Sequence, residues 1–525
     1  MDSFDYIIVG AGTAGCIVAS RLGADGARRV LLLEAGGTDR RFWIQLPIGY
    51  GRTFTDPRVN WKYQGEPDAG LDNRRAYVPR GKVLGGSGSI NAMVYVRGLP
   101  QDYDDWRDLG NPGWGFDDIL PCFERAEKLI QLTDVSPDAH LLTRAYIESC
   151  RQLGLPVTPN FNGPESEGVG IYRFTTRGGV RQSTAKCYLR PALKNPSLQL
   201  RLKAHALRIL TENRRAVGVQ YRHAGSTLEA RATKAVILCA GAVNTPQLLQ
   251  LSGIGPRALL ARHGIPLILD SPAVGQNLQD HLAVSYFYRS TIPTLNDELS
   301  RWRGKLKAVA RYLGSRRGPL AMSVNQGGGF VRSDSSQRHA NLQLYFNPMT
   351  FTTAPGPERR LLMPDPFPAF LVSFSPCRPT SRGHLEIRSA SPFDAPAIHL
   401  NSLATEHDVL EAIAGTRLLR DIAGTAPLHN YVESEFRPGA EIQSDAERLA
   451  DFRQRAGSVF HLVSTCRMGP DPTSAVVDAR LRVHGIEALR IVDSSVFPTI
   501  TSGNTNAPTI MVGEKGASLL VEEEH

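Results

Sequence analysis

The chain contains 525 residues, enough for two or three domains, and its 42% hydrophobic and 21% charged composition is ordinary for a soluble globular protein. Its net charge is +9, but the lysines and arginines are interpreted as scattered, with no basic run interleaved with aromatic residues. No nucleic-acid partner is therefore expected. The seven cysteines form no CxxC pair, which favours reduced thiols in a cytoplasmic protein over a disulfide framework, and no metal site is predicted.

The first element in the chain is a strand, turn and helix with a glycine motif. An apolar run at residues 5–9 ends in Gly10-x-Gly12-x-x-Gly15, and a second apolar run ends in Glu34. Gly10 permits a tight turn, Gly12 lets a pyrophosphate approach the backbone, and Gly15 lets the helix pack closely on the strand. The helix N-terminus attracts the phosphates, and Glu34 accepts hydrogen bonds from a ribose. The motif predicts dinucleotide binding without separating FAD from NAD, and the acid disfavours NADP.

A second glycine-rich stretch occupies residues 80–93. So many small residues cannot build a packed core, but they let backbone amides touch a flat or charged ligand. Two interpretations remain open at this point, a flexible loop and a second phosphate and ring cradle.

Further elements follow from the spacing of apolar residues. A helix is predicted at 116–129, and another follows Thr405, which stands three residues before Asp408 in a capping-box pattern. From about residue 282 to 450, strand-like segments dominate. Strands are predicted at 198–210, 216–221, 235–242, 341–346, 370–374, 384–388 and 489–493.

The C-terminal part contains a second group of chemically interesting residues. His461 lies in an apolar context, Asp493 ends a predicted strand, and Asn506 lies in a polar turn that leads into a final helix. A histidine in apolar surroundings is more often a satisfied core residue than a catalyst. The pattern alone therefore leaves both interpretations of His461 open.

Taken together, these blocks resemble the glucose–methanol–choline (GMC) family of flavin oxidoreductases over essentially the whole chain. The resemblance rests on the first glycine motif with Glu34, on residues 81–98, on residues 241–255 with the linker 274–281, and on the His461 block with Asp493 and Asn506. The blocks at residues 81–98 and 241–255 are more specific to the family than the glycine motif.

The resemblance implies an α/β fold, with a doubly wound, Rossmann-like FAD-binding domain and an antiparallel-sheet substrate domain with helices. The FAD-binding domain is expected to consist of residues 1–155, 196–281 and 451–525. Residues 156–195 and 282–450 are expected to form the substrate domain.

The resemblance also implies which residues bind FAD. The expected set is Gly10, Gly12, Thr13, Ala14, Gly15, Glu34, Ala35, Gly81, Val83, Gly85, Gly86, Ser87, Asn91, Ala92, Met93, Val94, Leu207, Ala240, Gly241, Asp493, Ser494, Ala507 and Thr509. Some members of the family attach the flavin through a histidine after the double glycine. Residues 87–91 contain no histidine, so the FAD is expected to be non-covalent.

The chemistry of such a site follows from its cofactor. An alcohol carbon loses hydride to the flavin only if the hydroxyl proton also leaves. The resemblance makes His461 the base, acting near pH 6 to 8, and Asn506 its partner that orients the substrate oxygen. Segments at 160–193 look like L-sorbose dehydrogenases, whereas Thr465–Gly469 and Gly513–Lys515 also look like choline and alcohol dehydrogenases.

The sequence leaves the substrate and the partners open. An alcohol, more polyol-like or aliphatic than choline, is expected to give its electrons to a quinone-type or artificial acceptor. An oxidase that uses oxygen is the alternative, followed by a hydroxynitrile-lyase type of enzyme. No apolar run spans a membrane and the first strand leaves no room for a signal peptide, so a cytoplasmic protein is expected, with loose membrane association and a homodimer left open.

Overall fold

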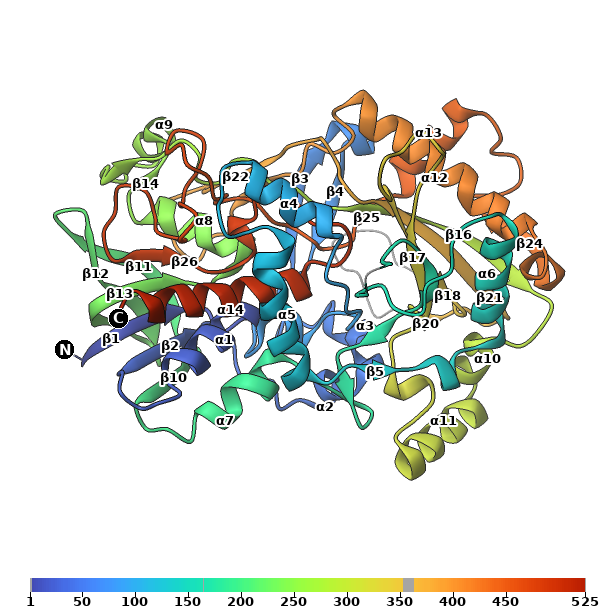
Figure 1. The fold of residues 1–525 in the computed structure, drawn as a ribbon, viewed down its shortest axis with the longest axis horizontal. Helices are drawn as coiled ribbons and strands as arrows, with labels where there is room; N and C mark the ends of the chain where they lie inside the picture. Colours follow the sequence, from blue (N-terminus) through green and yellow to red (C-terminus); the bar gives the residue numbers. More distant parts are fainter. Residues whose placement is uncertain (1, 164, 353–362, 525) are drawn as a thin grey trace.

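The structure is a computed structural model that describes residues 2–163, 165–352 and 363–524. Two bodies lie side by side, each built on a seven-stranded sheet (Figure 1). The chain crosses between them several times, and the N- and C-terminal segments lie together on the first body. Both ends of the chain therefore build the same domain.

The sheet of the first body has the strand order β10-β2-β1-β13-β12-β11, with β26 paired to β13. Its parallel part consists of β1 (Asp2–Val9), β2 (Val30–Glu34), β10 (Leu198–Leu202), β13 (Ser226–Leu238) and β26 (Leu489–Ile491). The antiparallel strands β12 (Arg215–His223) and β11 (His205–Glu212) complete it. The strand predicted at 198–210 is thus two strands, β10 and β11.

Continuous apolar runs explain why these strands are central. Residues 6–9 of β1 pair with 30–33 of β2 and 235–238 of β13 in parallel register, and nearly all of their side chains are buried. A strand covered on both faces needs such a run. The helices α1 (Thr13–Leu22) and α14 (Asn506–Glu522) pack on one another beside this sheet, which joins the first glycine motif to the C-terminal block.

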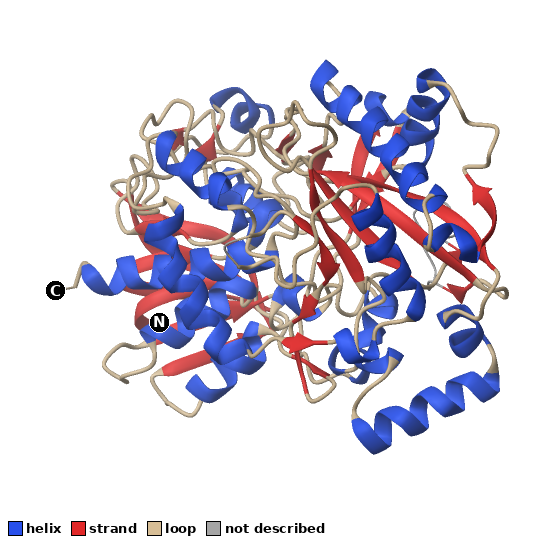
Figure 2. Cartoon of the chain, turned by 45° about the vertical axis from the view of Figure 1, so that its right-hand side comes forward, coloured by secondary structure: helices blue, strands red, loops and turns tan. Residues whose placement is uncertain are grey.

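The second body is an antiparallel sheet in the order β24-β16-β21-β18-β17-β6, with β25 paired to β16. Its strands are β6 (Gly168–Ile171), β16 (Leu282–Ser290), β17 (Gly327–Val331), β18 (Leu342–Asn347), β21 (Ala369–Pro376), β24 (Val432–Arg437) and β25 (Gly457–Ser458). The predicted helix after Thr405 is α12 (Glu406–Gly424), and the Thr405 hydroxyl accepts from the Asp408 amide as its cap. Figure 2 shows α12 and α13 (Asp445–Arg455) covering one side of this sheet. The α/β fold with a second, antiparallel domain is confirmed.

The remaining elements connect or cover the two sheets. The longer helices among them are α4 (Pro100–Asp108), α5 (Phe116–Ile130), α6 (Leu141–Gln152), α8 (Gly241–Leu251), α9 (Arg257–Arg262), α10 (Leu295–Ser300) and α11 (Trp302–Ser315). Short elements include α2 (Phe42–Gln45), α3 (Tyr50–Thr53), α7 (Arg190–Ala192), β3 (Tyr63–Asp68), β4 (Arg74–Val78), β19 (Phe351–Thr352), β20 (Met363–Pro364), β22 (His384–Glu386) and β23 (Ala397–His399).

Packing suggests a change to one domain boundary. Helix α6 lies within the first predicted FAD-binding segment, yet Leu142, Tyr146 and Cys150 are buried in the core of the second sheet. We therefore propose the five-segment division with its first crossing before α6 instead of at residue 155.

A membrane-spanning helix, a metal site and a disulfide framework were not expected, and the structure can be searched for them only within its described residues. Across residues 2–163, 165–352 and 363–524, no helix is long and apolar enough to cross a bilayer. The same ranges contain no group of three or more histidine, cysteine or acidic residues that could hold a metal. All seven cysteines are free.

Candidate active site

The first glycine motif forms one wall of a long cavity between the two ends of the chain. Gly10 has φ +99°, and a Cβ there would lie 2.5 Å from the Cys239 carbonyl oxygen. A Cβ on Gly15 would lie 1.9 Å from the Gly10 carbonyl oxygen, so only glycine lets α1 pack this closely on the turn. A Cβ placed on Gly12 would have its nearest neighbour, the Cys239 carbonyl oxygen, 3.8 Å away, and Gly12 lines the cavity. These are the roles that the motif predicts.

Glu34 lies at the end of β2, on the cavity wall. Its two carboxylate oxygens accept from the amides of Ala11 at 3.0 Å and Gly36 at 2.7 Å. Burial raises the pKa of Glu34 to about 7, against the effect of the two amides. Each oxygen keeps a lone pair for a further donor, such as a ribose hydroxyl.

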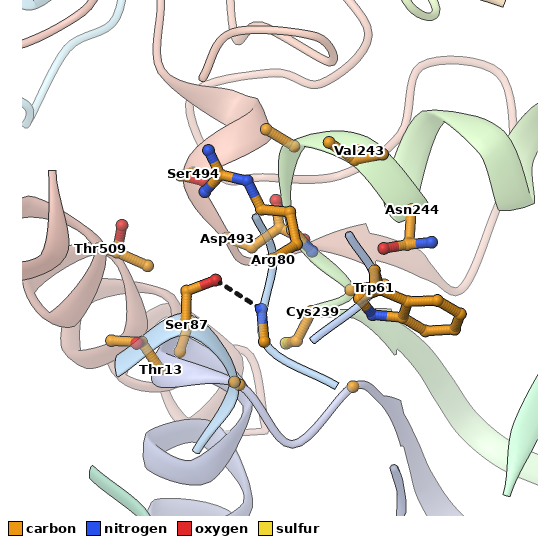
Figure 3. Close-up of a pocket in the computed structure, with 18 of the residues that line it drawn as sticks. Thr13, Trp61, Arg80, Ser87, Cys239, Val243, Asn244, Asp493, Ser494 and Thr509 are labelled. Atoms are coloured by element: carbon orange, nitrogen blue, oxygen red, sulfur yellow. Dashed lines mark hydrogen bonds between the residues drawn. The ribbon is translucent and has the colours of Figure 1, made fainter. Parts of the chain in front are cut away.

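Residues 80–93 form a cradle packed against the first motif. The Gly85 amide donates to the Ala11 carbonyl at 2.7 Å, and a Cβ on Gly86 would lie 2.7 Å from the Gly12 Cα. The Ser87 hydroxyl accepts from the Gly81 amide at 3.1 Å (Figure 3). Because these contacts fix the loop beside the cavity, the structure favours the cradle over a flexible loop.

Asp493 closes the opposite wall. Its carboxylate accepts from the amides of Gly241 and Ser495, both at 2.8 Å, and from the Thr245 hydroxyl at 2.7 Å. Burial raises the pKa of this carboxyl, while these donors oppose the rise. Asp493 thereby ties the start of α8 to the strand β26, and Figure 3 shows it next to Ser494 in the cavity wall.

Most of the predicted cofactor residues line this cavity together. They are Gly10, Gly12, Thr13, Ala14, Glu34, Ala35, Gly81, Gly86, Ser87, Asn91, Ala92, Met93, Val94, Ala240, Gly241, Asp493, Ser494 and Thr509. Gly15, Val83, Gly85, Leu207 and Ala507 do not line it. Residues 204–206, which precede Leu207 at the start of β11, do so instead.

The cavity is also lined by Trp61, Arg80, His205 and Asn244, which were not predicted from the sequence. Arg80 opens the glycine-rich stretch of residues 80–93 and had a detectable signal, since it is a cation among small residues. Its Nη2 donates to the Phe460 carbonyl at 2.7 Å, while its Nε is buried without a partner. Burial lowers the pKa of Arg80 to about 10.

Beyond this cavity, His461 forms a hydrogen-bonded pair with His281. The two Nδ1 atoms lie 2.9 Å apart, and His281 Nε2 lies 2.9 Å from the Cys377 carbonyl oxygen. A carbonyl only accepts, so Nε2 of His281 carries its proton and its Nδ1 is a lone pair. His461 must therefore donate through Nδ1–H, which leaves a lone pair on its Nε2.

The surroundings keep this pair neutral. Burial, then the proximity of His281 and Arg80, lowers the pKa of His461 well below its ordinary value. Burial likewise lowers the pKa of His281 to about 4. Asp280 accepts from the His461 backbone amide at 2.7 Å, and burial raises the pKa of its carboxyl to about 6. The acid limb expected near pH 6 to 8 therefore moves below the ordinary histidine value of about 6.5.

The structure brings a different asparagine to His461 from the one the sequence suggested. Asn504 Nδ2 lies 3.1 Å from His461 Nε2, and its Oδ1 accepts from Gln343 at 3.3 Å. Asn506, the first residue of α14, accepts from the Thr13 hydroxyl at 3.0 Å. Both asparagines line the cavity, but the contact expected for Asn506 is made by Asn504. The spacing Asn504-x-Asn506 offered two candidates, and the turn decides between them.

A second cavity, which we call the outer cavity, lies on the other side of His461 and has a volume of about 700 Å³. The two cavities share six lining residues, Phe54, Ala92, Val459, Phe460, His461 and Asn504. Apolar and aromatic side chains dominate the outer cavity, and Arg52 and Lys305 are the charged residues among the described part of its lining. The lone pair of His461 thus lies where a cofactor-sized groove meets an apolar chamber.

Comparison with known proteins agrees with this arrangement. Sequence profiles of the N- and C-terminal parts of the GMC oxidoreductases match residues 4–283 and 379–513. This chain belongs to the GMC oxidoreductase family. The recognition made from the sequence blocks is thereby confirmed.

Similar GMC oxidoreductases span nearly the whole chain. An oxygen-dependent choline dehydrogenase of Photobacterium profundum is 40% identical over 99% of this chain and 93% of its own. An alcohol dehydrogenase [acceptor] of Pseudomonas putida is 38% identical over 99% and 96%. The crystal structure of pyridoxine 4-oxidase from Mesorbium loti superposes with a TM-score of 0.87 at 28% identity, covering 99% of both chains.

GMC oxidoreductases bind FAD, and the long cavity fits that cofactor. Gly12 leaves open space at the N-terminus of α1, Glu34 has lone pairs free, and the buried Nε of Arg80 lacks a partner. An elongated ligand with a pyrophosphate, a ribose and a polar ring satisfies all three.

Proposed function

We propose that this GMC oxidoreductase oxidises an alcohol to an aldehyde or ketone, with non-covalent FAD and with His461 as the base. One observation carries the proposal: His461 Nε2 is an unprotonated lone pair at the junction of the cofactor cavity and the apolar cavity. A core histidine without a function would have no reason to lie there.

The cofactor would be held by residues at both ends of the chain. The Gly10–Gly15 turn and the N-terminus of α1 suit the pyrophosphate, and Glu34 suits the ribose. Residues 86–94, Asp493 and the N-terminus of α14 suit the flavin half. When bound, FAD supplies the two-electron acceptor that takes the hydride from the alcohol carbon.

His461 accounts for the proton that the alcohol must lose. The hydroxyl proton passes to Nε2, the hydride leaves the carbon that bears the hydroxyl, and the C–O bond becomes C=O. One proton and one hydride with its two electrons are thereby accounted for. The positive charge that His461 gains is stabilised by the hydrogen bond from its Nδ1–H to the lone pair of His281. The Cys377 carbonyl holds His281 in the tautomer that accepts this hydrogen bond.

Asn504 is the proposed partner that orients the substrate. Its amide N–H faces His461 Nε2, so an alcohol oxygen placed there accepts from Asn504 while its hydroxyl donates to the histidine. Gln343 fixes the orientation of this amide, and Tyr345 in turn donates to Gln343 at 2.6 Å. For Asn506 we retain a supporting role at the flavin, through Thr13.

The outer cavity favours an alcohol with an uncharged, apolar body. Its described lining contains no aspartate or glutamate to neutralise a quaternary ammonium, and Arg52 and Lys305 oppose a cation. A polyol would leave most of its hydroxyls against aromatic and aliphatic side chains, unpaired. Aliphatic and aromatic alcohols therefore fit better than choline or sugars.

The test is a stopped-flow screen of flavin reduction without oxygen. Hexanol, decanol and benzyl alcohol are expected to bleach the flavin, whereas choline and sorbose are expected to react at least about tenfold more slowly. Reoxidation by a soluble quinone faster than by oxygen supports an acceptor-linked dehydrogenase, and the reverse supports the oxidase alternative. No bleaching by any alcohol, with cyanide release from a hydroxynitrile, would support the lyase alternative instead.

The same preparation tests how the flavin is attached. Acid precipitation should leave the yellow flavin in the supernatant, since residues 87–91 offer no histidine for a covalent bond. Colour that remains with the denatured protein would contradict the non-covalent assignment.

A further inference from the structure

Helix α11 (Trp302–Ser315) exposes a continuous apolar stripe. Trp302, Leu306, Val309 and Leu313 are between 43% and 68% exposed. Their spacing of four, three and four residues places them on one face of the helix. The residues of α11 that are buried against the rest of the protein are Ala308 and Tyr312. Figures 1 and 2 show α11 at the lower edge of the second body, projecting from the rest of the ribbon.

Positive charge surrounds this stripe. Seven arginines and lysines lie between residues 301 and 317, and no acidic residue occurs between Glu298 and Asp334. The basic residues were expected to be scattered, whereas these seven lie on α11 and directly beside its two ends. Arg311 and Arg317 both pair with Asp138, and Arg303 lies over the Trp302 ring. Arg303, Lys305 and Lys307 have no carboxylate partner among the ion pairs of the described chain.

The stripe borders the apolar cavity that leads to His461. Lys305, Ala308, Val309, Tyr312 and Leu313 line that cavity from α11. The same rim carries two more exposed apolar side chains, Phe42 of α2 and Met363 of β20, at 67% and 54% exposed. The apolar surface outside and the apolar chamber inside are therefore continuous.

We propose that α11 docks this protein on the surface of a bilayer that contains anionic phospholipids. A helix with an apolar stripe led by tryptophan and leucine and bordered by basic residues lies in the lipid interface, with its cations at the headgroups. In this position the cavity mouth faces the acyl region, from which an apolar alcohol can enter. The inference rests on the surface of α11 and is independent of the proposed chemistry.

Charge decides against the other occupants. A second copy docked through the same face would set the unpaired Arg303, Lys305 and Lys307 against the same three cations, with no acidic residue on the helix to neutralise them. A nucleic acid would satisfy the cations but leave Trp302, Leu306 and Leu313 against a polar backbone. Only an anionic, partly apolar surface satisfies both parts of the helix.

Vesicle flotation of the FAD-loaded protein tests this inference. Binding is expected to vesicles of phosphatidylcholine mixed with phosphatidylglycerol, much less to phosphatidylcholine alone, and less at about 1 M than at about 0.1 M salt. The double variant Trp302→Ser/Leu306→Ser should bind about tenfold or more weakly, because it removes the leading apolar contacts. Arg303→Glu/Lys307→Glu should also lose about tenfold or more.

Two matched controls separate position from composition. Leu410→Ser removes an equally exposed leucine from α12, and Lys128→Glu/Lys194→Glu makes the same change in net charge elsewhere. Both should bind like the parent protein, and every variant should keep its flavin absorbance and its turnover of a water-soluble alcohol. Equal binding of the stripe variant and its parent, or no preference for anionic lipid, overturns the proposal. A lipid-free dimer that the stripe variant breaks would overturn it in favour of a second copy.

Discussion

The proposed cofactor cavity and the proposed catalytic junction of this GMC oxidoreductase are built in different ways. The shape of the cofactor cavity is set by backbone geometry. Gly10, Gly15 and Gly86 each stand where a Cβ would overlap another backbone atom. At the junction, four side chains and one carbonyl from residues 281, 343, 377, 461 and 504 form a single hydrogen-bonded chain. The first depends on local chain shape, and the second depends on tertiary structure.

Burial acts on both regions, and it shifts the pKa values of their titratable groups in opposite directions. It raises the pKa of the Glu34 carboxyl to about 7 and lowers the pKa of the His461 imidazole, so in each case the neutral form is favoured. A neutral histidine is a competent base, whereas a neutral carboxyl is a poorer acceptor for a ribose. If the two regions are independent, changes in one should leave the function of the other intact.

The largest effect is expected from His461→Ala. Flavin reduction by a good alcohol should slow by roughly two to four decades, the usual cost of a lost general base. FAD should stay fully bound, because its binding residues lie on the other side of the junction. Stopped-flow reduction together with the flavin-to-protein ratio measures both. Loss of FAD in this variant would break the proposed separation, and undiminished reduction would show that another group is the base.

Glu34→Ala should give the converse result. Loss of a charged acceptor for the ribose should weaken FAD about 10- to 100-fold, with little change in the reduction rate of the fraction that remains loaded. Titration of FAD into the cofactor-free protein measures the affinity. In the parent the affinity should fall as pH drops through about 7, where Glu34 gains a proton, and this dependence should vanish in the variant. An unchanged affinity would remove Glu34 from the cofactor site.

The contrast between the regions also explains what the sequence made predictable. The strands β1, β2 and β13, the helix caps and the two glycine blocks act over short stretches, so residues 5–34 and 80–93 indicated the fold and most of the cofactor residues. Leu207 does not line the cavity, whereas residues 204–206, which directly precede it, do. Its expected contact with the cofactor stays a prediction.

The catalytic junction was only half predictable. His461 was recognised through the resemblance, but nothing local distinguishes Asn504 from Asn506, which are two residues apart on one turn. His281 ends a linker that the resemblance covers, yet its contact with His461 spans 180 positions of the chain. The basic residues on and beside α11 are visible in the sequence at 301–317, but which face of the helix is covered depends on tertiary packing.

The next effect concerns His281 and sharpens the junction. His281→Phe keeps a ring in place but removes the lone pair that accepts from His461 Nδ1. The tautomer of His461 is then no longer fixed, and flavin reduction should slow about tenfold, an acceptor hydrogen bond to a developing charge being worth about 1.5 kcal/mol. His281→Gln, whose amide oxygen can accept again, should restore part of the rate.

The pH profile distinguishes this positioning role from a structural one. In the parent, reduction should fall as pH drops through the pKa of His461, below about 6.5, because only the neutral imidazole takes a proton. Burial is the main cause of that low value. Because His281 is itself neutral above about pH 4, its lone pair stabilises protonated His461 through Nδ1–H, so His281→Phe should move the limb further down. A slower variant with an unmoved limb would leave His281 with a packing role only.

The smallest expected effect separates the two asparagines. Asn504→Ala removes the amide that faces His461 Nε2, so flavin reduction should slow about three- to tenfold, the value of one neutral hydrogen bond to the substrate oxygen. Asn506→Ala is the matched control: it removes the same side chain two residues away, breaks only the contact with Thr13, and should slow reduction by less than about threefold. Because both residues line the cofactor cavity, loss of flavin alone would affect them alike, and the rates must be compared at equal FAD content. A larger cost at Asn506 than at Asn504 would return the substrate-orienting role to Asn506 and show that the cofactor-bound turn exchanges the two amides.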